Sequence, residues 1–299
     1  MRSAPAPAEQ PPRSAEAALT TDRFAAFSFV DRISLRGDDG RVEGCYTVPA
    51  GAGRFPASLM AEAVGQLAAW WAMARLDFQW RPVAGLAAAT RYHAAVAPGQ
   101  TLRLEADVAR CDAEAVAYGG RAYIDGRLAV ELVDCVGPML PLAEFDDPDA
   151  LRADFATLCG AGAPAGRFGG VPAPQIETTE AAAGQQRRAR LQVPAAGTPL
   201  FADHFPRRPV YPGTLLLDAL AGLALDVARE ALPAAAGTMS VQAVHDVKIR
   251  SFTPPGVLLD LSVDLIEAAD TSVRLKLGAR AEGKAVAQAR IEIGTGGTR

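Results

Sequence analysis

One stretch of the chain, Leu200–Leu225, holds a histidine and an acid at a spacing that suits proton transfer. His204 lies among prolines at positions 206, 209 and 212, which fix φ and prevent regular structure, so an ordered but irregular loop is expected. Asp218 is the single charge in the first two turns of the apolar helix predicted after Gly213. A buried carboxyl is unfavourable without a partner or a role, so its pKa is expected to be shifted. The stretch therefore predicts a base and an acid for general acid–base chemistry.

This stretch resembles the signature of the hotdog-fold 3-hydroxyacyl-[acyl-carrier-protein] dehydratases of fatty-acid synthesis, roughly Gly-His-Phe-Pro-x-x-Pro-x-x-Pro-Gly before an apolar helix with Glu or Asp. The matching residues are His204-Phe205-Pro206, Pro209 and Pro212-Gly213. Asp218 follows the histidine by 218 − 204 = 14 positions, which is the spacing of the family. Two positions depart from the pattern, because Asp203 replaces the glycine before the histidine and Gly222 replaces the glutamine one turn after the acid.

The chemistry of such dehydratases explains why a histidine and a carboxylic acid occur together. Loss of water from a 3-hydroxyacyl thioester needs a proton removed beside the carbonyl and a proton added to the leaving hydroxyl. A neutral imidazole suits the first step, and a carboxyl kept protonated by apolar surroundings suits the second. The backbone N–H of Gly213, at the start of the predicted helix, is available to the enolate oxygen. No metal and no organic cofactor is expected.

The composition excludes several other classes of protein. The 299 residues are 49% hydrophobic and 21% charged, enough for two domains with their own cores, and a net charge of −4 argues against a nucleic-acid partner. Four cysteines show no Cys-x-x-Cys pair, so neither a zinc site nor a disulfide framework is expected. The longest apolar runs are broken by Glu62, Asp218 or Asp226 before they could cross a bilayer. A soluble, cytoplasmic protein without membrane partners is predicted.

A second apolar helix with one acid precedes this stretch by about half the chain. It follows Phe55-Pro56, with Ser58 as its expected N-cap, and carries Glu62 and then Gln66. Three kinds of landmark recur at one offset: the helix acids Glu62 and Asp218 differ by 156, the Pro-Gly turns Gly99 and Gly256 by 157, and the hairpin glycines Gly126 and Gly283 by 157. We interpret this recurrence as an internal duplication.

Each copy is expected to be an α+β unit of strand, loop, buried helix and three or four antiparallel strands, which is the hotdog layout. We predict a disordered tail at 1–20, a first unit at 21–146, a linker at 147–185 and a second unit at 186–299. The chain then resembles, over Phe24–Ile293, the double-hotdog dehydratase domains of polyketide and polyunsaturated-fatty-acid synthases. This resemblance implies a pseudo-dimer within one chain, with further dimerisation left open.

The two copies differ at their site positions. Counting back 14 positions from Glu62 gives Val48, no histidine lies nearby, and Ala50–Arg54 replaces the histidine loop. In the family the histidine of one unit faces the acid of its partner, so the resemblance implies one composite site that pairs His204 with Glu62. It also implies that Asp218 marks a vestigial second site.

The resemblance assigns supporting roles as well. The Val210 carbonyl would accept the other ring N–H of the histidine, and Gln66 would orient the acid. Arg207 and Arg208 flank the loop and are either a weak docking pair for an acidic carrier protein or simply solvated. His93 and His245 lie on strand-like segments without a motif and are interpreted as structural.

The expected function is dehydration of 3-hydroxyacyl thioesters on acyl carrier protein to 2-enoyl thioesters, in fatty-acid or polyketide-type synthesis, with double-bond isomerisation as a close variant. Two alternatives stay open. A catalytically inactive hotdog scaffold that binds an acyl carrier or a synthase subunit is favoured by Asp203 and by the loss of one site. A hotdog thioesterase is disfavoured by the histidine loop.

Overall fold

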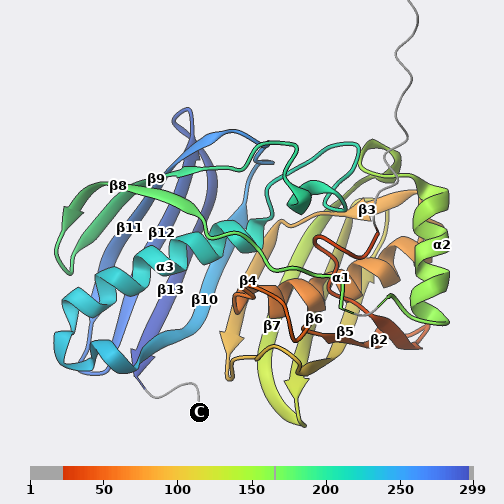
Figure 1. Cartoon of the computed structure of the whole chain (residues 1–299), viewed down its shortest axis with the longest axis horizontal. Helices are drawn as coiled ribbons and strands as arrows, with labels where there is room; N and C mark the ends of the chain where they lie inside the picture. Colours follow the sequence, from red (N-terminus) through yellow and green to blue (C-terminus); the bar gives the residue numbers. More distant parts are fainter. Residues whose placement is uncertain (1–22, 165, 296–299) are drawn as a thin grey trace, which may run out of the picture.

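The structure is a computed structural model that describes residues 23–164 and 166–295, so the predicted tail at 1–20 lies outside the described residues (Figure 1). The α-helices of this part of the chain are α1 (Ser58–Arg75), α2 (Pro148–Cys159) and α3 (Gly213–Ala231). Short 3-10 helices are η1 (Leu142–Glu144), η2 (Pro199–Phe201) and η3 (Pro233–Thr238).

The strands of the first half of the chain are β1 (Arg32–Arg36), β2 (Arg41–Thr47), β3 (Trp80–Pro82), β4 (Leu86–Tyr92), β5 (Thr101–Cys111), β6 (Ala115–Ile124) and β7 (Arg127–Pro141). Those of the second half are β8 (Gln175–Ala182), β9 (Gln186–Gln192), β10 (Met239–Ile249), β11 (Leu258–Ala268), β12 (Ser272–Ala281) and β13 (Lys284–Thr295). Together with two long central helices they form an α+β structure, as the sequence predicts.

The strands form one antiparallel sheet that passes through both halves. The strand order is β1-β2-β5-β6-β7-β4-β10-β13-β12-β11-β9-β8, and β3 pairs with β7 beside this path. The two halves meet where β4 pairs with β10, with Thr90 opposite Val244 and Ala87 opposite Val247. No strand edge is left open at this seam, because each half supplies the neighbour that the other lacks.

The second half repeats the strand order of the first. Read from the outer edge to the seam, β1-β2-β5-β6-β7-β4 corresponds to β8-β9-β11-β12-β13-β10. The turns agree as well: Asp125-Gly126 and Glu282-Gly283 are both two-residue hairpin loops with positive φ at each position, of 50° and 77° in the first and 49° and 77° in the second. These matched turns support the interpretation of an internal duplication.

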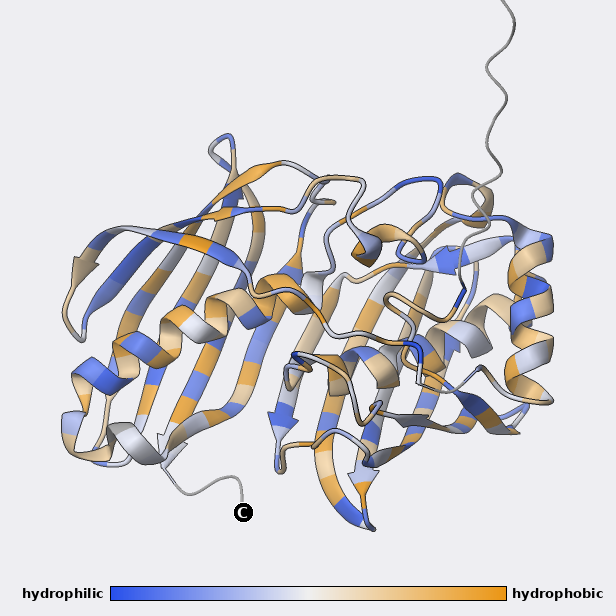
Figure 2. Cartoon of the chain, in the orientation of Figure 1, coloured by the Kyte–Doolittle hydropathy of each residue, from blue (hydrophilic) through white to orange (hydrophobic). Residues whose placement is uncertain are grey.

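Each central helix packs on the inner face of its own half of the sheet, and the two helices contact each other. The strands alternate buried and exposed residues, because one face covers the helices and the other faces solvent. Hydrophobic and hydrophilic bands alternate along the strands in Figure 2. Helix α1 buries Leu59, Val64 and Leu67 completely. Its N-cap position is Ala57 without a side-chain cap, so the expected capping by Ser58 is wrong, since Ser58 lies inside the helix and is buried.

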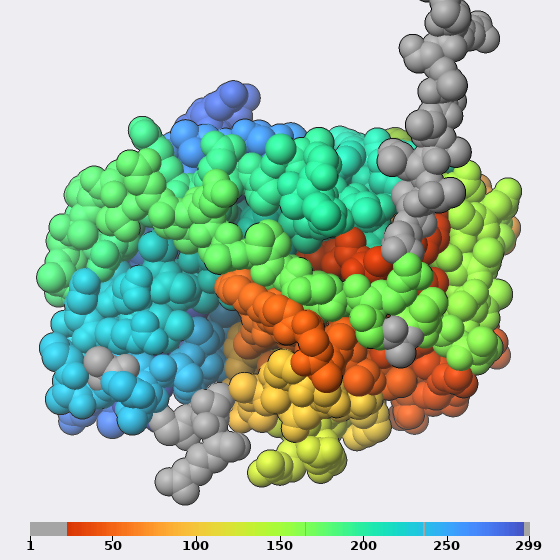
Figure 3. Space-filling model, in the orientation of Figure 1, coloured from red at the N-terminus to blue at the C-terminus, as the bar shows by residue number. Residues whose placement is uncertain are grey.

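The predicted linker, 147–185, contains regular structure at both ends. Helix α2 begins where the Asp147 carboxylate accepts hydrogen bonds from the backbone N–H groups of Asp149 (3.0 Å) and Ala150 (3.2 Å). Strand β8 pairs with β9, so the second half of the sheet begins before the expected boundary at residue 186. The chain between α2 and β8 crosses the face of both halves, in green in Figure 3. Among the helices of the described residues, none combines the length and apolar character needed to span a membrane.

Candidate active site

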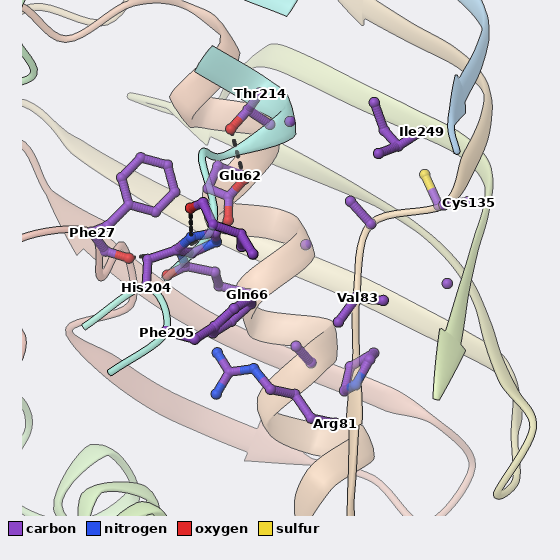
Figure 4. Close-up of a pocket in the computed structure, with 18 of the residues that line it drawn as sticks. Phe27, Glu62, Gln66, Arg81, Val83, Cys135, His204, Phe205, Thr214 and Ile249 are labelled. Carbon is purple, nitrogen blue, oxygen red and sulfur yellow. Dashed lines mark hydrogen bonds between the residues drawn. The ribbon is translucent and has the colours of Figure 1, made fainter. Parts of the chain in front are cut away.

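The candidate site is a cavity of about 250 Å³ lined by both halves of the chain (Figure 4). His204, on the loop between η2 and α3, and Glu62, on the first turns of α1, both line it. Hydrophobic side chains such as Val136 and Ile249, from either side of the β4–β10 seam, line another part. The structure therefore brings the base candidate of one half and the acid candidate of the other to a single cavity.

The histidine loop is held by backbone hydrogen bonds rather than by regular structure. Arg207 N–H donates to the Phe145 carbonyl (3.0 Å), and Tyr211 N–H donates to the Thr253 carbonyl (2.7 Å). His204 Nδ1 lies 3.2 Å from the Val210 carbonyl oxygen. Because a carbonyl only accepts, Nδ1 carries the proton, and Nε2 keeps a lone pair that can act as a base.

The imidazole of His204 lies between aromatic rings. It stacks on Phe205, with ring centroids 4.2 Å apart, and meets the edge of Phe27 at 4.8 Å. Burial lowers the pKa of His204 to about 3, and the nearby Arg81 guanidinium, which lies 4.0 Å from the centroid of the Phe205 ring, adds to this effect. The imidazole is therefore neutral at physiological pH, as a general base must be.

The carboxyl of Glu62 is held by neutral donors. Thr214 Oγ1, from the first turn of α3, donates to Glu62 Oε2 (2.8 Å), and Gln66 Nε2 donates to Glu62 Oε1 (3.0 Å). Burial raises the pKa of Glu62, while these hydrogen bonds and the Arg81 charge oppose the shift. The raised pKa favours the protonated form, which is the form that a general acid needs.

Gln66 connects the acid to the segment that precedes β1. Its Oε1 accepts from the Phe29 N–H (2.8 Å), and its Nε2 donates to the Phe27 carbonyl (2.9 Å) as well as to Glu62. Both N–H donors of the amide and one of the two acceptor sites of its oxygen are thereby used. The Gln66 amide thus donates to one oxygen of the Glu62 carboxyl, the group that the resemblance expects it to orient.

Gly213 begins α3 and lines the same cavity. Pro212 is at the N-cap position, and no side chain caps the helix. The N–H groups of the first turn therefore have no side-chain acceptor, and the positive end of the helix dipole lies at the cavity. The arrangement suits stabilisation of a developing oxyanion.

Asp218 lies elsewhere. Its carboxylate forms an ion pair with Arg54, from the loop that replaces the histidine loop in the first half, and both line a separate surface pocket with Gly222 and Arg229. Burial raises the pKa of Asp218, and the Arg54 guanidinium opposes the shift. The structure does not bring Asp218 to His204.

Arg207 and Arg208 are about half exposed and have partners within the chain. Arg207 donates to the Asp146 carbonyl (2.8 Å) and to Asp147 Oδ2 (2.9 Å), and Arg208 donates to Glu144 Oε2 (3.1 Å). These contacts fasten the histidine loop to the end of the first half. Any carrier protein that docks here would have to compete with them.

The sequence did not single out three residues of the site. Thr214 follows Gly213 without a recognisable signal, and Arg81 lies on a three-residue strand just after α1 and belongs to no motif. Asp203 was visible only as a departure from the glycine of the family. Among the described residues, no group of three or more potential ligands could hold a metal ion, and the four cysteines are free.

Known proteins resemble parts of this chain. Residues 179–290, which include the histidine loop, match the family described as ApeI dehydratase. The curated 3-hydroxyacyl-[acyl-carrier-protein] dehydratase FabZ of Novosphingobium aromaticivorans is 44% identical over 69 residues, or 22% of this chain and 44% of the relative. FabZ of Ruminiclostridium cellulolyticum is 30% identical over 100 residues, or 33% of this chain and 70% of the relative. The chain belongs to the hotdog-fold FabZ-like dehydratase family.

The matched region spans about half the length of the first curated relatives, 44% and 58%. Solved structures resemble the chain over both halves. One is described as an oleoyl thioesterase from Lactobacillus plantarum (TM-score 0.56, 11% identity, 88% of this chain and 99% of that one). Another is an acyl-ACP thioesterase from Bacteroides thetaiotaomicron (TM-score 0.52, 10% identity, 86% and 98%). At these identities the likeness shows the hotdog fold alone.

Proposed function

We propose that the protein dehydrates 3-hydroxyacyl thioesters to 2-enoyl thioesters at the cavity between its two halves. The observation that carries the proposal is the pairing in one cavity of a neutral imidazole, His204, with a carboxyl whose pKa is raised, Glu62. A neutral imidazole can act as the base, and the raised pKa favours the protonated form of the carboxyl that an acid needs.

In the proposed mechanism, His204 Nε2 removes a proton from the carbon next to the thioester carbonyl. The electron pair moves to the carbonyl oxygen, where the N–H of Gly213 stabilises the enolate. The enolate then re-forms the carbonyl and expels the 3-hydroxyl, which takes its proton from Glu62 and leaves as water. Transfer of the proton on the imidazolium to the Glu62 carboxylate restores both groups. Neither oxidant nor co-reactant is consumed.

We propose further that the chain is a double hotdog in which one of two sites is complete. The repeated strand order, the matched hairpin turns and the coverage of both halves by the solved structures support this arrangement. Asp218 then occupies the position that corresponds to Glu62 and is paired with Arg54, from the loop that replaces the histidine loop. The second site is catalytically silent in this proposal.

The substrate in this proposal is carried on acyl carrier protein. The curated relatives are named for acyl groups on that carrier, and a cavity that lies between the two halves suits a thioester delivered on a flexible arm. The solved structures with the same fold suggest thioester hydrolysis as a second candidate function. Hydrolysis would release a free thiol and a carboxylic acid, whereas dehydration keeps the thioester intact.

The test is turnover of a 3-hydroxyacyl thioester on carrier protein, followed by the absorbance of the conjugated enoyl product and, in parallel, by thiol release. We expect enoyl product without thiol. Glu62→Gln should lower the rate about 10²-fold or more, the usual scale for a general acid, and Asp218→Asn should leave it nearly unchanged. Thiol release without enoyl product would establish the thioesterase, and the reverse ranking of the two acids would overturn the composite site. Absence of both activities would favour the scaffold.

A further inference from the structure

A segment that precedes β1 covers the cavity. We call residues 23–30 the strap. In the space-filling view it lies, in red, between the teal loop that carries His204 and the green chain between α2 and β8 (Figure 3). Arg23 fastens its beginning through ion pairs with Asp146 and Asp154, both at 2.9 Å. Phe24, Phe27 and Ser28 line the cavity.

The middle of the strap is held by Asp203, from the other half of the chain. The Asp203 carboxylate accepts hydrogen bonds from the N–H of Phe27 (2.6 Å), the N–H of Ala26 (3.0 Å) and the hydroxyl of Ser28 (3.0 Å). Burial raises the pKa of Asp203, and these three hydrogen bonds oppose the shift. Three donors that converge on two oxygens suit a carboxylate, because its oxygens are acceptors only and offer about four lone-pair sites.

The strap continues this network to the acid. Phe27 donates its N–H to Asp203, and its carbonyl accepts a hydrogen bond from Gln66 (2.9 Å). Gln66 also donates to Glu62 (3.0 Å). Thr214 completes the series on the second carboxyl oxygen of Glu62 (2.8 Å). An unbroken series of hydrogen bonds thus joins the residue before the histidine to the acid candidate.

The same strap residue covers the base. The ring of Phe27 meets the imidazole of His204 edge-on at a centroid distance of 4.8 Å, on a side chain that also lines the cavity. This contact helps to keep water from the imidazole, and exclusion of water is the main cause of the lowered pKa of His204. Other charged groups that line the cavity are Glu62 on α1, Arg81 on β3, Asp154 on α2, and Arg23, Asp146 and Asp203 on the adjoining segments.

We propose that Asp203 is a positioning residue that clamps the strap over the site and thereby sets the surroundings of His204 and the orientation of Glu62 together. The role rests on the proposed dehydratase function. It explains the departure from the family pattern, because the glycine found there has no side chain with which to hold a strap. Fixing two reacting groups to within a fraction of an ångström is a large part of catalysis, and a small displacement lowers the rate up to about 10²-fold.

The first arm of the test measures rates. Asp203→Gly, which restores the residue of the family, is expected to lower kcat about 10- to 10²-fold, and Asp203→Asn, which keeps one acceptor oxygen, is expected to lower it less. Asp260→Asn, at an exposed position of strand β11, serves as the control and should leave kcat unchanged. A kcat for Asp203→Gly within twofold of the wild type would overturn the proposal.

The second arm does not depend on turnover. The chain has three histidines, so the ¹⁵N signals of His204 can be assigned by comparison with His204→Ala and titrated by NMR. In the wild type His204 should stay neutral from pH 8 to pH 5, whereas in Asp203→Gly its pKa should rise toward the ordinary value of about 6.5. An unchanged titration of His204 would overturn the clamp even if kcat of Asp203→Gly is lowered, because Asp203 would then act by another route.

The two arms separate failure of the clamp from failure of the proposed function. A wild type that turns over no 3-hydroxyacyl thioester would overturn the function, and the titration alone would then decide the clamp. If Asp203→Gly does not fold, Asp203→Asn and Ser28→Ala decide by the same two measurements. Ser28→Ala removes one of the three donors, so a smaller rise in the pKa of His204 is expected. If the pKa of His204 rises in neither Asp203→Asn nor Ser28→Ala, the clamp is overturned.

Discussion

The two central helices carry carboxyls at corresponding positions, Glu62 on α1 and Asp218 on α3. The two carboxyls differ in the groups that bind them, and therefore in how readily each can hold a proton. Burial raises the pKa of both. Glu62 is bound by a hydroxyl and an amide, with the Arg81 charge as the weakest of the opposing effects. Asp218 is bound directly by the Arg54 guanidinium. A neutral donor tolerates a protonated carboxyl, whereas an ion pair requires an ionised one, so only Glu62 is suited to donate a proton.

The residues around the two carboxyls also differ. One turn after Glu62 stands Gln66, which is tied to the strap, whereas one turn after Asp218 stands Gly222, whose surroundings are open. The position that corresponds to His204 is Val48, which is fully buried in the core. In the proposed double hotdog, one half supplies the base candidate and the other half supplies the acid candidate. The two halves share a strand order but differ in the residues that surround the corresponding carboxyls.

The largest expected effect concerns the base. His204→Ala should lower kcat about 10²-fold or more, and the double variant with Glu62→Gln should be little slower than either single variant, because residues that act as one unit are not additive. The matched control is His245→Ala, on β10, whose ring is partly exposed near Glu292 (3.8 Å). Steady-state rates of the four variants check this. Additive losses would show that the two residues act independently.

The pH dependence should separate the two groups. Because the pKa of His204 is lowered to about 3, kcat/KM should not fall between pH 8 and pH 5 through protonation of the imidazole. Deprotonation of Glu62, whose pKa is raised, should produce the alkaline limb, and Glu62→Gln should remove that limb. Profiles of kcat/KM for wild type and variant test this; an acid limb near pH 6.5 would contradict the neutral, enclosed imidazole.

The same shift predicts a sign for stability. Between pH 6.5 and pH 3 the unfolded chain binds a proton at His204 and the folded chain does not, so the free energy of unfolding falls as the pH falls, by up to about 1.4 kcal/mol per unit. His204→Ala removes this contribution and should lose less stability than the wild type on going from pH 7 to pH 5. Denaturant melts at the two pH values measure the difference.

A smaller effect is expected at the other carboxyl. Arg54→Met should lower the free energy of unfolding by about 1–3 kcal/mol, because it leaves the Asp218 carboxylate buried without its partner. In the Asp218→Asn background the same substitution should cost much less. Neither variant should change kcat. A large loss of turnover in Arg54→Met would mean that the second site contributes to catalysis.

The smallest effect compares two helix glycines. An added Cβ at Gly222 meets no atom within 4 Å, so Gly222→Ala should raise the free energy of unfolding by about 0.5–1 kcal/mol through the better helix propensity of alanine. At Gly65 of α1 the added Cβ would lie 3.1 Å from the hydroxyl oxygen of Tyr118, and the gain should be lost. Thermal melts of the two variants provide the check, and equal gains would contradict the tighter packing around α1.

The sequence by itself determined much of the architecture. Proline spacing around His204, apolar helices with one acid each, and hairpin turns at a constant offset are local features, so they can be read without knowing the contacts. The same offset predicted the repeat that appears as matched strand order in the two halves. The strand Gln175–Ala182 was not predicted, because it directly follows an Ala-, Gly- and Pro-rich stretch that was interpreted as linker, although its partner is the next strand along the chain, β9.

Only the tertiary structure decided how the candidate site is assembled. Thr214 reaches Glu62 across 152 positions of the chain, and Asp203 reaches Phe27 across 176. Neither contact has a sequence signal, because each depends on how the two halves of the sheet join at β4 and β10. The protonation states follow from the same cause, since burial and the choice of neutral or charged neighbours, not residue type, shift the pKa values of His204 and Glu62.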